Sequence, residues 1–531
     1  MKIGVLLQSE KCPKWQRNII SAIQESEMLE LSALIYNGEP EIRIKQKVIR
    51  LPKILRVVNS ILNPFSYGLI HVYSLWDNKK HAEEEDLWEL KPVTADKAVQ
   101  RLTVEPVRKG HCHYFKDEDV ENIKHAELDV LIRFGFSIVR GSVLTSTRYG
   151  MWSFHHGDNR FYRGGPPGVW ELIKGKTEIS VTLQLLSDVL DCGQTIARSS
   201  HRYKPFSVYQ NKCTIYKACG DLLLNKLEQV GQQGFEFIKK SELFNEPIPK
   251  TKILKTPRNF EFFPAFVQCA KQYIAPRLVR SKKIQWFLAI KKWDGLIGDF
   301  SDASVIDTPK DRFYADPILV SDANRQYVFF EEFVYKKGYA HISVGEIENN
   351  KLRNIEIIID ESFHLSYPFI IKDGDDYYLI PESRTLKSIR LYKCIQFPYK
   401  WRFEKAMFVG EELLDPTIWK QGRTYYLFAN KYTPERKTSN EELHIFYSDS
   451  LMGDWKSHPL NPVAVDICNS RPAGSLFLHE GKLIMVNQNS SLRYGHSMTF
   501  NEITLSKTFF DRKVVKTTNP NWLKGNLGTH T

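Results

Sequence analysis

Four segments in the second half of the chain repeat one plan at a spacing of about 50 residues, which is typical of propeller blades. Each begins at a polar or proline-marked position, continues with a short apolar strand and a turn, and ends with an aromatic-rich strand. The segments are RFYADPILVSDANRQYVFFEEF, LSYPFIIKDGDDYYLIPES, LLDPTIWKQGRTYYLFANK and RPAGSLFLHEGKLIMVNQN. The pattern predicts an all-β five-bladed propeller over residues 283–531, with the fifth blade built from KIQWFLAIKKW and the C-terminal residues. The final GNLGTHT is typical of the approach to a closing strand, so we expect the natural chain to extend past Thr531.

Charged residues mark these repeats where the first strands of propeller blades line a central channel. We predict a pocket there that is formed by Asp316, Glu382, Asp415 and Arg471. Further candidates for the mouth of this pocket are His364, Tyr494 and His496. Three interpretations of the four charged residues remain open: they cap turns and hydrogen-bond between blades, they bind a glycan, or they cleave one.

Residues 283–531 resemble the five-bladed propellers of the family 43 type glycoside hydrolases. They resemble still more the N-terminal domain of plant glucosamine inositolphosphorylceramide transferase. The hydrolases usually carry Asp, Asp and Glu on successive blades. Here the second repeat begins with Ser366, Tyr367 and Pro368, and Glu382 lies inside that repeat. The hydrolytic set of three acids is therefore not reproduced.

Residues 153–191 concentrate chemically reactive side chains in the first half of the chain. MWSFHH predicts a strand that delivers His155 to a cleft at its carboxyl end. GDNRFYRGGPPG predicts a loop whose glycines allow close approach to a ligand, with Arg160 and Arg163 available for an anionic group. A short helix and a strand follow, after which Asp191 returns to the end of the sheet where His155 lies. The pair resembles an imidazole oriented by a carboxylate.

This segment closely resembles the catalytic core of the folate-dependent formyltransferases, which include methionyl-tRNA formyltransferase and the sugar N-formyltransferases. The family pattern is Asn-x-His, Tyr-Arg-Gly, ETGVT and Asp-x-Gly. It is matched in order and spacing by SFH at 153–155, YRG at 162–164, TEISVT, and DCG at 191–193. The resemblance covers residues 1–205 and implies an α/β Rossmann-like domain that uses 10-formyltetrahydrofolate.

The resemblance also implies roles for individual residues. A neutral amine would attack the formyl carbon, His155 would steady the oxyanion or move a proton, and Asp191 would orient His155 and accept the amine proton. The upstream strand and loop would hold the cofactor through Arg133, Phe134, Gly135, Phe136 and Asp188. The residues assigned to the substrate are His156, Asn159, Arg160, Tyr162 and Arg163. No step requires a metal.

One position departs from the family pattern, because Ser153 stands where the family has its catalytic Asn. That amide helps to polarise the formyl oxygen, and one such donor contributes roughly 3 to 4 kcal/mol in enzymes. A serine hydroxyl is shorter and offers one donor, so Ser153 would donate from a shifted pose, or Asn159 or His156 would replace it. The departure supports a rival interpretation in which the first domain has lost catalysis.

Basic charge and the absence of a long apolar run limit the partners and the location. The formal net charge is +12, and residues 271–292 carry basic but no acidic side chains, interleaved with aromatic rings. This stretch fits a solvated linker, with contact to anionic lipid or nucleic acid as the open alternative. No apolar stretch reaches the ~18 residues that a membrane span needs, and the N-terminus lacks a signal-peptide pattern. We therefore expect a cytoplasmic protein.

Residues 206–282 are predicted to close the first domain and to lead into the second. A strand and a helix are expected first, with Gly220 breaking the apolar run, and a linker helix is expected near residues 264–278. The 8 cysteines are scattered without a C-x-x-C pair, which favours a reducing compartment. Cys112 lies between two histidines, but neighbours on a strand alternate faces and no second ligand cluster is present. We therefore predict no metal site.

These observations lead to one hypothesis and two rivals. The hypothesis is an N-formyltransferase that moves a formyl group from 10-formyltetrahydrofolate to a nucleotide-linked or lipid-linked amino sugar of a surface glycan such as lipopolysaccharide. The propeller would then recognise a carbohydrate or hold a second activity in the same pathway. The first rival is a glycan-binding or glycoside-hydrolase-like protein with a degenerate formyltransferase domain. The second rival, formylation of initiator methionyl-tRNA, draws on the basic charge, but no nucleic-acid motif is visible. The sequence leaves the oligomeric state open.

Overall fold

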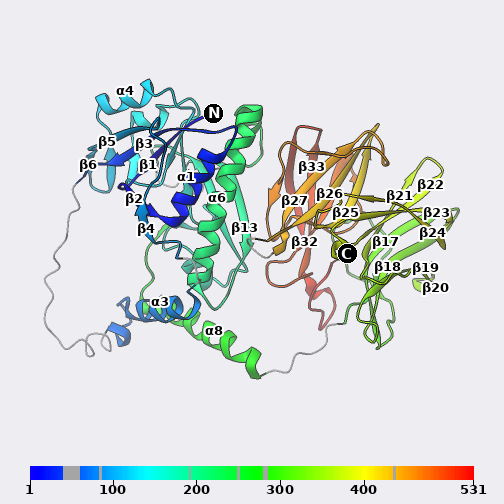
Figure 1. Ribbon diagram of the computed structural model, residues 1–531. Coiled ribbons are helices and arrows are strands. Elements are labelled where there is room, and N and C mark those ends of the chain that lie inside the picture. The colour runs from blue at the N-terminus through cyan, green and yellow to red at the C-terminus, as the bar shows by residue number, and fades with distance from the viewer. Residues whose placement is uncertain are drawn as a thin grey trace. The chain divides into compact units, whose positions relative to one another are not determined.

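The computed structural model describes residues 1–39, 60–82, 86–189, 193–247, 251–278, 285–434 and 438–530, without the side chains of 272–278. The chain forms two compact units, Met1–Arg280 and Ser281–Thr531, which we call unit 1 and unit 2. Unit 1 combines a sheet with helices, whereas unit 2 is built from strands (Figure 1). Among the described residues, no helix has the length and apolar character needed to cross a bilayer.

A seven-stranded sheet forms the centre of unit 1, in the order β13-β12-β10-β8-β1-β3-β5. Its parallel strands are β1 (Lys2–Leu7), β3 (Glu30–Asn37), β5 (Gln100–Val104), β8 (Val130–Arg133) and β10 (Met151–His155). The antiparallel strands at one edge are β12 (Glu178–Leu185) and β13 (Gln194–Arg202). The chain order of the parallel strands reverses at β1, so the carboxyl ends of β1 and β8 flank the point where sheets of this kind bind ligands.

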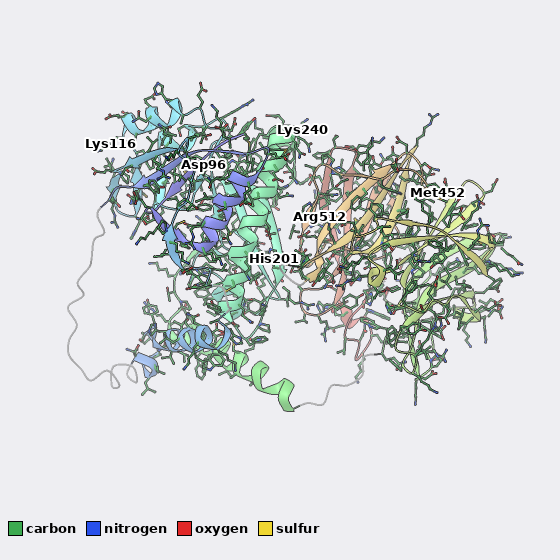
Figure 2. All side chains as sticks on the ribbon, in the orientation of Figure 1. Asp96, Lys116, His201, Lys240, Met452 and Arg512 are labelled. Atoms are coloured by element: carbon green, nitrogen blue, oxygen red, sulfur yellow. The ribbon has the colours of Figure 1, made fainter. Side chains whose placement is uncertain are left out.

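Side chains that alternate along the central strands divide the core of unit 1 into two layers. Val5 and Leu7 of β1 pack into one layer, and Leu6 packs into the other. The first layer is covered by α1 (Lys14–Glu25) and α6 (Val208–Gln233), which lie side by side in Figure 1. The second is covered by α4 (Asp117–His125). Side chains fill both layers, while Lys116 and Lys240 point out from the surface (Figure 2). Burial on both faces explains why β1 and β8 are continuous apolar runs.

Helix α6 continues through Gly220, contrary to the break that the sequence predicts there. A Cβ at this position would lie 3.3 Å from Ile19 Cγ1 of α1. The glycine therefore permits close packing of α6 against α1 instead of ending a segment.

Smaller elements complete unit 1. The short strands are β2 (Lys11–Pro13), β4 (Leu90–Pro92), β6 (Val107–Lys109), β7 (Cys112–Tyr114), β9 (Ile138–Arg140), β11 (Arg163–Gly164) and β14 (Ile253–Leu254). The remaining helical segments are α3 (Gly68–His81), η1 (Ser142–Thr145), α5 (Val169–Ile173), α7 (Glu236–Lys239) and α8 (Asn259–Leu278). Helix α8 includes the linker helix expected at residues 264–278 and begins five residues earlier.

Among its described residues, unit 2 contains four antiparallel sheets of four or five strands that follow one another along the chain, each coinciding with one of the four repeats (Figure 1). The first two comprise β17 (Arg312–Asp322), β18 (Arg325–Val334), β19 (Ala340–Glu348) and β20 (Lys351–Ile359), then β21 (Ser366–Asp373), β22 (Asp376–Glu382), β23 (Ile389–Gln396) and β24 (Lys400–Met407). The third comprises β25 (Leu413–Gln421), β26 (Thr424–Thr433), β27 (Thr438–Ser448), β28 (Lys456–Ser457) and β29 (Ala464–Val465). The fourth comprises β30 (Arg471–Pro472), β31 (Phe477–His479), β32 (Lys482–Asn489), β33 (Ser497–Leu505) and β34 (Phe510–Thr517).

The segment expected to start a fifth blade forms a separate two-stranded sheet. It pairs β15 (Ala289–Ile290) with β16 (Ser304–Val305). Two 3-10 turns, η2 (Arg384–Leu386) and η3 (Pro520–Trp522), complete the described elements of unit 2. The C-terminal residues return to this segment, where the rings of Trp286 and His530 meet with centroids 4.3 Å apart. A complete fifth blade stays a prediction.

The core of unit 2 lies between successive sheets. Phe329 of β18, Phe369 of β21 and Leu427 of β26 belong to one cluster that joins the first three sheets. Phe428 and Met485 belong to another that joins the third sheet to the fourth. Adjacent side chains such as Leu427 and Phe428 thus serve the two faces of one strand, as the period of two requires.

Candidate functional site

Three residues with the same backbone conformation lie in the first strands of the first three sheets of unit 2. Asp316, Tyr367 and Asp415 have φ angles of +50°, +46° and +49°, and each precedes a proline. The strand pairing shifts register at each of these positions. A positive φ is strained for residues other than glycine, and a bulge redirects the side chain that it carries. The repeated local conformation therefore aims three side chains away from the regular strand faces.

Tyr367 connects the second sheet to the third and fourth. Its hydroxyl lies 2.7 Å from Thr417 Oγ1 and accepts a hydrogen bond from Gly474 N at 2.8 Å. The side chain is fully buried, so its ring fills the space between these sheets. Tyr367 thus stands where the hydrolases usually carry their second Asp, and it joins the sheets instead.

Arg471 forms a buried network with Asp415 and Glu382. Its Nε and Nη2 donate to the two carboxylate oxygens of Asp415 at 2.5 and 3.0 Å. Glu382 Oε2 lies 3.4 Å from Arg471 Nη2 and also accepts from Asp415 N at 3.2 Å. Burial and the nearby Asp415 carboxylate raise the pKa of Glu382 well above its usual range. The structure thus brings three of the four predicted pocket residues together, with the Asp415 carboxylate bound to a fixed cation.

Asp316, the fourth predicted residue, lies beside Glu331 and His530. Asp316 Oδ2 accepts from Tyr367 N at 3.3 Å, and His530 Nδ1 lies 3.5 Å from Oδ1. Asp316 Oδ1 is buried and accepts no hydrogen bond from the part of the chain that the structure describes. Burial and the neighbouring Asp316 carboxylate raise the pKa of Glu331 well above its usual range, and burial raises the pKa of Asp316. The pair therefore shares a proton that exposed carboxyl groups would release.

A cavity of about 350 Å³ joins these groups, because Asp316, Glu331, Glu382 and Arg471 all line it. Asp415 lies outside its wall. Of the residues predicted for the mouth, His364 and Tyr494 line the cavity and His496 does not. The cavity is also lined by Trp286, Arg384, Asn440 and His530. The volume lies at the lower end of the range of ligand sites, roughly 300 to 1,000 Å³.

The sequence did not reveal Glu331. Glu331 pairs with Ala315 across the first sheet, as Glu382 pairs with Ser366 across the second, so the two glutamates occupy equivalent positions. Aligning the second strand of the first repeat with that of the second would have revealed Glu331, because it falls at the position of Glu382. His530 carried no such signal, because it reaches the cavity from outside the repeats.

In unit 1 the predicted site lies at the carboxyl ends of β8 and β10. Ser153 of β10 lies in register with Arg133 of β8, and Arg133 Nε donates to Ser153 Oγ at 3.0 Å. Arg133 Nη1 donates to Ser137 O at 2.7 Å. The structure therefore places a guanidinium beside the position where the formyltransferases carry their Asn, although the resemblance assigned Arg133 to the cofactor.

His155 follows Ser153 on the same face of β10 and is buried. Its Nε2 lies 2.6 Å from the carbonyl oxygen of Tyr162. A Cβ on Gly157 would lie 3.4 Å from His155 Nε2 and 3.5 Å from Glu171 Oε1, so the imidazole and this carboxyl flank the glycine. Burial raises the pKa of Glu171 to about 7. Asp191, the predicted partner of His155, lies outside the described residues, and the sequence reasoning missed Glu171.

The other loop residues assigned to the substrate are engaged within the protein. His156 packs on Tyr216, with ring centroids 4.5 Å apart, and burial lowers its pKa to about 3. Asn159 is buried and accepts from Arg198 Nη2 at 3.0 Å. The Tyr162 hydroxyl is buried without a hydrogen-bond partner, and burial raises its pKa.

The two arginines predicted to bind an anion also contact protein groups. Arg160 forms an ion pair with Asp158 at 2.6 Å. Arg163 Nη1 donates to Thr251 O at 3.0 Å, beside the pairing of β11 with β14. These contacts hold the loop in one conformation.

The segment predicted to bind the cofactor lies at the switch point of the sheet. The N–H groups of Phe134 and Gly135 donate to the Leu6 carbonyl at 3.0 and 2.8 Å. A Cβ on Gly135 would lie 2.2 Å from the backbone of the loop after β1, so only glycine fits there. Phe136 has a φ of +61°, and Asp188 accepts from a backbone N–H after β9 at 3.0 Å. The backbone N–H groups of Phe134 and Gly135, two of the residues assigned to the cofactor, thus form hydrogen bonds inside the sheet.

These observations define unit 2 as a propeller-like domain. We call its cavity of about 350 Å³, which is lined by Asp316, Glu331, Glu382 and Arg471, the acidic pocket. Residues 300–526 match the family model described as glucosamine inositolphosphorylceramide transferase 1, N-terminal. The chain is 32% identical over 195 residues to the transferase of that name from Oryza sativa subsp. japonica, and 31% identical over 200 residues to that from Arabidopsis thaliana. These matches cover 36% and 37% of this chain but 26% of each relative. The chain thus spans about a quarter of the length of these relatives.

A second similarity is to formyltransferases. The chain is 26% identical over 143 residues to methionyl-tRNA formyltransferase from Prochlorococcus marinus, which covers 26% of this chain and 40% of that protein. Among solved structures, glycinamide ribonucleotide transformylase 1 from Symbiobacterium toebii matches with a TM-score of 0.29, 13% identity, and coverage of 44% of this chain and 88% of that one. A thermostable family-43 glycoside hydrolase matches with a TM-score of 0.31, 12% identity, and coverage of 40% and 81%.

Proposed function

We propose that unit 2 binds a sugar that carries a free amine, with the amine placed at Asp316 and Glu331. The observation that carries this proposal is Asp316 Oδ1, a buried oxygen in the cavity wall to which the described residues donate no hydrogen bond. An unsatisfied buried acceptor costs about 1–3 kcal/mol. A ligand ammonium group has three donors and a positive charge, so it would satisfy this oxygen and contact Glu331.

The rest of the cavity suits the remaining groups of a sugar. Arg384, Asn440 and His364 supply polar contacts for hydroxyl groups, and Trp286 and Tyr494 offer aromatic faces for the apolar side of the ring. The similarity to plant proteins named for glucosamine supports a sugar of this kind.

The geometry favours binding over hydrolysis. Glycosidases place two carboxyl groups on opposite sides of the scissile bond, about 5 Å or more apart. Asp316 and Glu331 instead lie close enough that each affects the pKa of the other. Asp415 is bound by Arg471, and Tyr367 replaces the expected second acid. Among the residues that the structure describes, the set of three acids found in the hydrolases is therefore not reproduced.

Calorimetry of the full chain with glucosamine, N-acetylglucosamine and glucose tests this function. We expect glucosamine to bind at least about tenfold more tightly than the other two, which is ~1.4 kcal/mol. Asp316→Asn should remove the preference, whereas Asp449→Asn, at an exposed aspartate of the same unit, should retain it. Equal affinity for the three sugars, or no binding of any of them, would contradict the proposal.

A second candidate, N-formyl transfer to such an amine, is favoured by the arrangement of Arg133, Ser153 and His155 at the ends of β8 and β10. In this proposal 10-formyltetrahydrofolate would supply the formyl group. Arg133 and Ser153 would donate to the formyl oxygen, and His155 would take the proton of the attacking amine. In such a transfer the amine nitrogen would form a bond to the formyl carbon as the bond to the cofactor nitrogen breaks, and His155 would pass the amine proton to that departing nitrogen.

Incubation of the protein with 10-formyltetrahydrofolate and a panel of free, nucleotide-linked and lipid-linked amino sugars tests this activity. Mass spectrometry should detect the gain of one formyl group on an amino sugar. A complete absence of formylated product with every acceptor would leave sugar binding as the function of the chain.

A further inference from the structure

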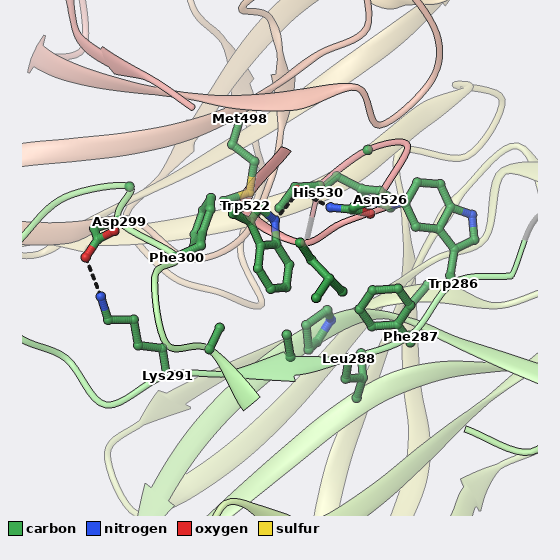
Figure 3. A pocket seen from close by; sticks show the side chains of 18 of the residues that line it. Trp286, Phe287, Leu288, Lys291, Asp299, Phe300, Met498, Trp522, Asn526 and His530 are labelled. Carbon is green, nitrogen blue, oxygen red and sulfur yellow. Dashed lines mark hydrogen bonds and ion pairs between the residues drawn. The ribbon is translucent and has the colours of Figure 1, made fainter. Parts of the chain in front are cut away.

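A second, larger cavity lies next to the acidic pocket. It measures about 650 Å³ and is lined mainly by apolar side chains from residues 285–303 and from the C-terminal segment 522–530. Figure 3 shows Trp286, Phe287, Phe300, Met498 and Trp522 around it. Polar side chains also line it, among them Lys291 and Asp299, which form an ion pair at 2.5 Å (Figure 3).

The two cavities share part of their walls. Trp286, Ala315, Asp316, Tyr494 and His530 line both. The shared residues are held together by their own contacts, since Tyr494 packs on His530 with ring centroids 5.2 Å apart. A ligand group in the acidic pocket is therefore separated from the apolar cavity by no more than one side chain.

Large apolar side chains at the apolar cavity remain exposed. Trp293, Leu296 and Leu527 line it and are 59%, 60% and 57% exposed. Exposed apolar side chains that line a concave surface mark a site for an apolar partner. The partner must also suit the acidic pocket that shares its wall.

We propose that the ligand of unit 2 is an amphiphile, with its amino sugar in the acidic pocket and a hydrocarbon chain in the adjoining apolar cavity. This inference rests on the proposed sugar-binding function and identifies the group to which the sugar is attached. Each buried CH₂ group of such a chain contributes about 0.8 kcal/mol. A chain attached to the sugar therefore raises the affinity, and the increase depends on residues outside the acidic pocket.

Four ligands separate the two contributions: glucosamine, glucose, octyl glucosaminide and octyl glucoside, each below its micelle concentration. Binding to the full chain is measured by calorimetry. We expect octyl glucosaminide to bind at least about 100-fold more tightly than glucosamine, a gain of ~2.7 kcal/mol. Octyl glucoside should gain from its chain but lack the gain from the amine.

Substitutions in the wall of the apolar cavity test whether the hydrocarbon chain binds there. Leu527→Asp and Trp293→Ser should each reduce the gain from the octyl group at least about tenfold and leave glucosamine affinity unchanged. Leu478→Asp is the matched control, because Leu478 is 63% exposed and lies outside the cavity wall. Equal affinities of glucosamine and octyl glucosaminide would overturn the inference and leave sugar binding intact, as would equal losses in Leu527→Asp and Leu478→Asp. Failure of both amino sugars to bind would overturn the proposed function as well.

Discussion

Arg471 holds the carboxylate of Asp415 through two hydrogen bonds, and both side chains are buried at the junction of the third and fourth sheets of unit 2. The planar guanidinium matches the two carboxylate oxygens, a geometry that lysine does not reproduce. Because Arg471 also reaches Glu382, one cation balances two acids from different sheets. The pair therefore links neighbouring sheets and also fixes Arg471 in the wall of the acidic pocket.

Replacement of Arg471 by Ala should strongly destabilise unit 2. The change leaves the Asp415 carboxylate buried without its cation, which costs about 3–5 kcal/mol. Arg325→Ala is the control, because the exposed ion pair of Arg325 with Glu346 contributes less than about 1 kcal/mol. Chemical unfolding followed by fluorescence measures both free energies. Equal losses in the two variants would show that the Asp415 contact has no special weight.

Glu331 should make the stability of unit 2 depend on pH. Burial raises the pKa of Glu331 in the folded state, so the folded protein binds more protons than the unfolded chain. Stability contributed by this group is therefore present at low pH and is lost as the pH rises from the usual glutamate range through the raised folded value. Glu331→Gln should flatten this decline in the free energy of unfolding, measured at a series of pH values. Glu348→Gln, at an exposed position of the same unit, should leave the decline as it is in the unchanged protein.

His155→Ala should lower formyl transfer about 10²–10⁴-fold, the usual contribution of a general acid or base. His111→Ala, at an exposed histidine of unit 1, should retain the rate of the unchanged protein. The measurement is the initial rate of formylated amino sugar formation. If the His155 variant keeps full activity, the imidazole is structural, as its contact with the Tyr162 carbonyl also allows. Calorimetry with 5-formyltetrahydrofolate adds a second criterion, since failure to bind would favour the degenerate-domain rival.

Gly220→Leu should destabilise unit 1 by about 1–3 kcal/mol, because the new side chain would enter the contact between α6 and α1. Gly231→Leu provides a matched control in the same helix, since no atom lies within 4 Å of a Cβ at that position. Leucine is the better helix former there, so this variant should gain up to about 1 kcal/mol. Thermal unfolding compares the two. A neutral Gly220 variant would mean that α1 moves aside without cost.

The repeat pattern predicted the four sheets of unit 2 because each repeat encodes its own turn, strand alternation and proline-marked start. It also singled out Asp316, Glu382 and Arg471, which the structure places around one cavity. The pattern did not reveal that Tyr367 fills the space between the sheets, because its hydrogen bonds to Thr417 and Gly474 join residues far apart in the chain.

In unit 1 local sequence motifs predicted the order of strands and loops around the site. They did not predict which side chains contact one another there. A motif places Ser153 and His155 on one face of a strand, while the neighbour of Ser153 depends on which strand pairs beside it. Arg133 becomes that neighbour only because β8 pairs with β10 in register. The proximity of Glu171 to His155 likewise depends on the loop that folds back at Gly157.

The contact between Trp286 and His530 has a consequence for synthesis and assembly. These residues come from opposite ends of unit 2, and both belong to the wall of the acidic pocket. A growing polypeptide therefore cannot present the pocket until His530 has left the ribosome and has docked against Trp286, which is made long before. Any ligand that binds there favours the docked form by mass action, so ligand binding and the docking of His530 against Trp286 strengthen each other.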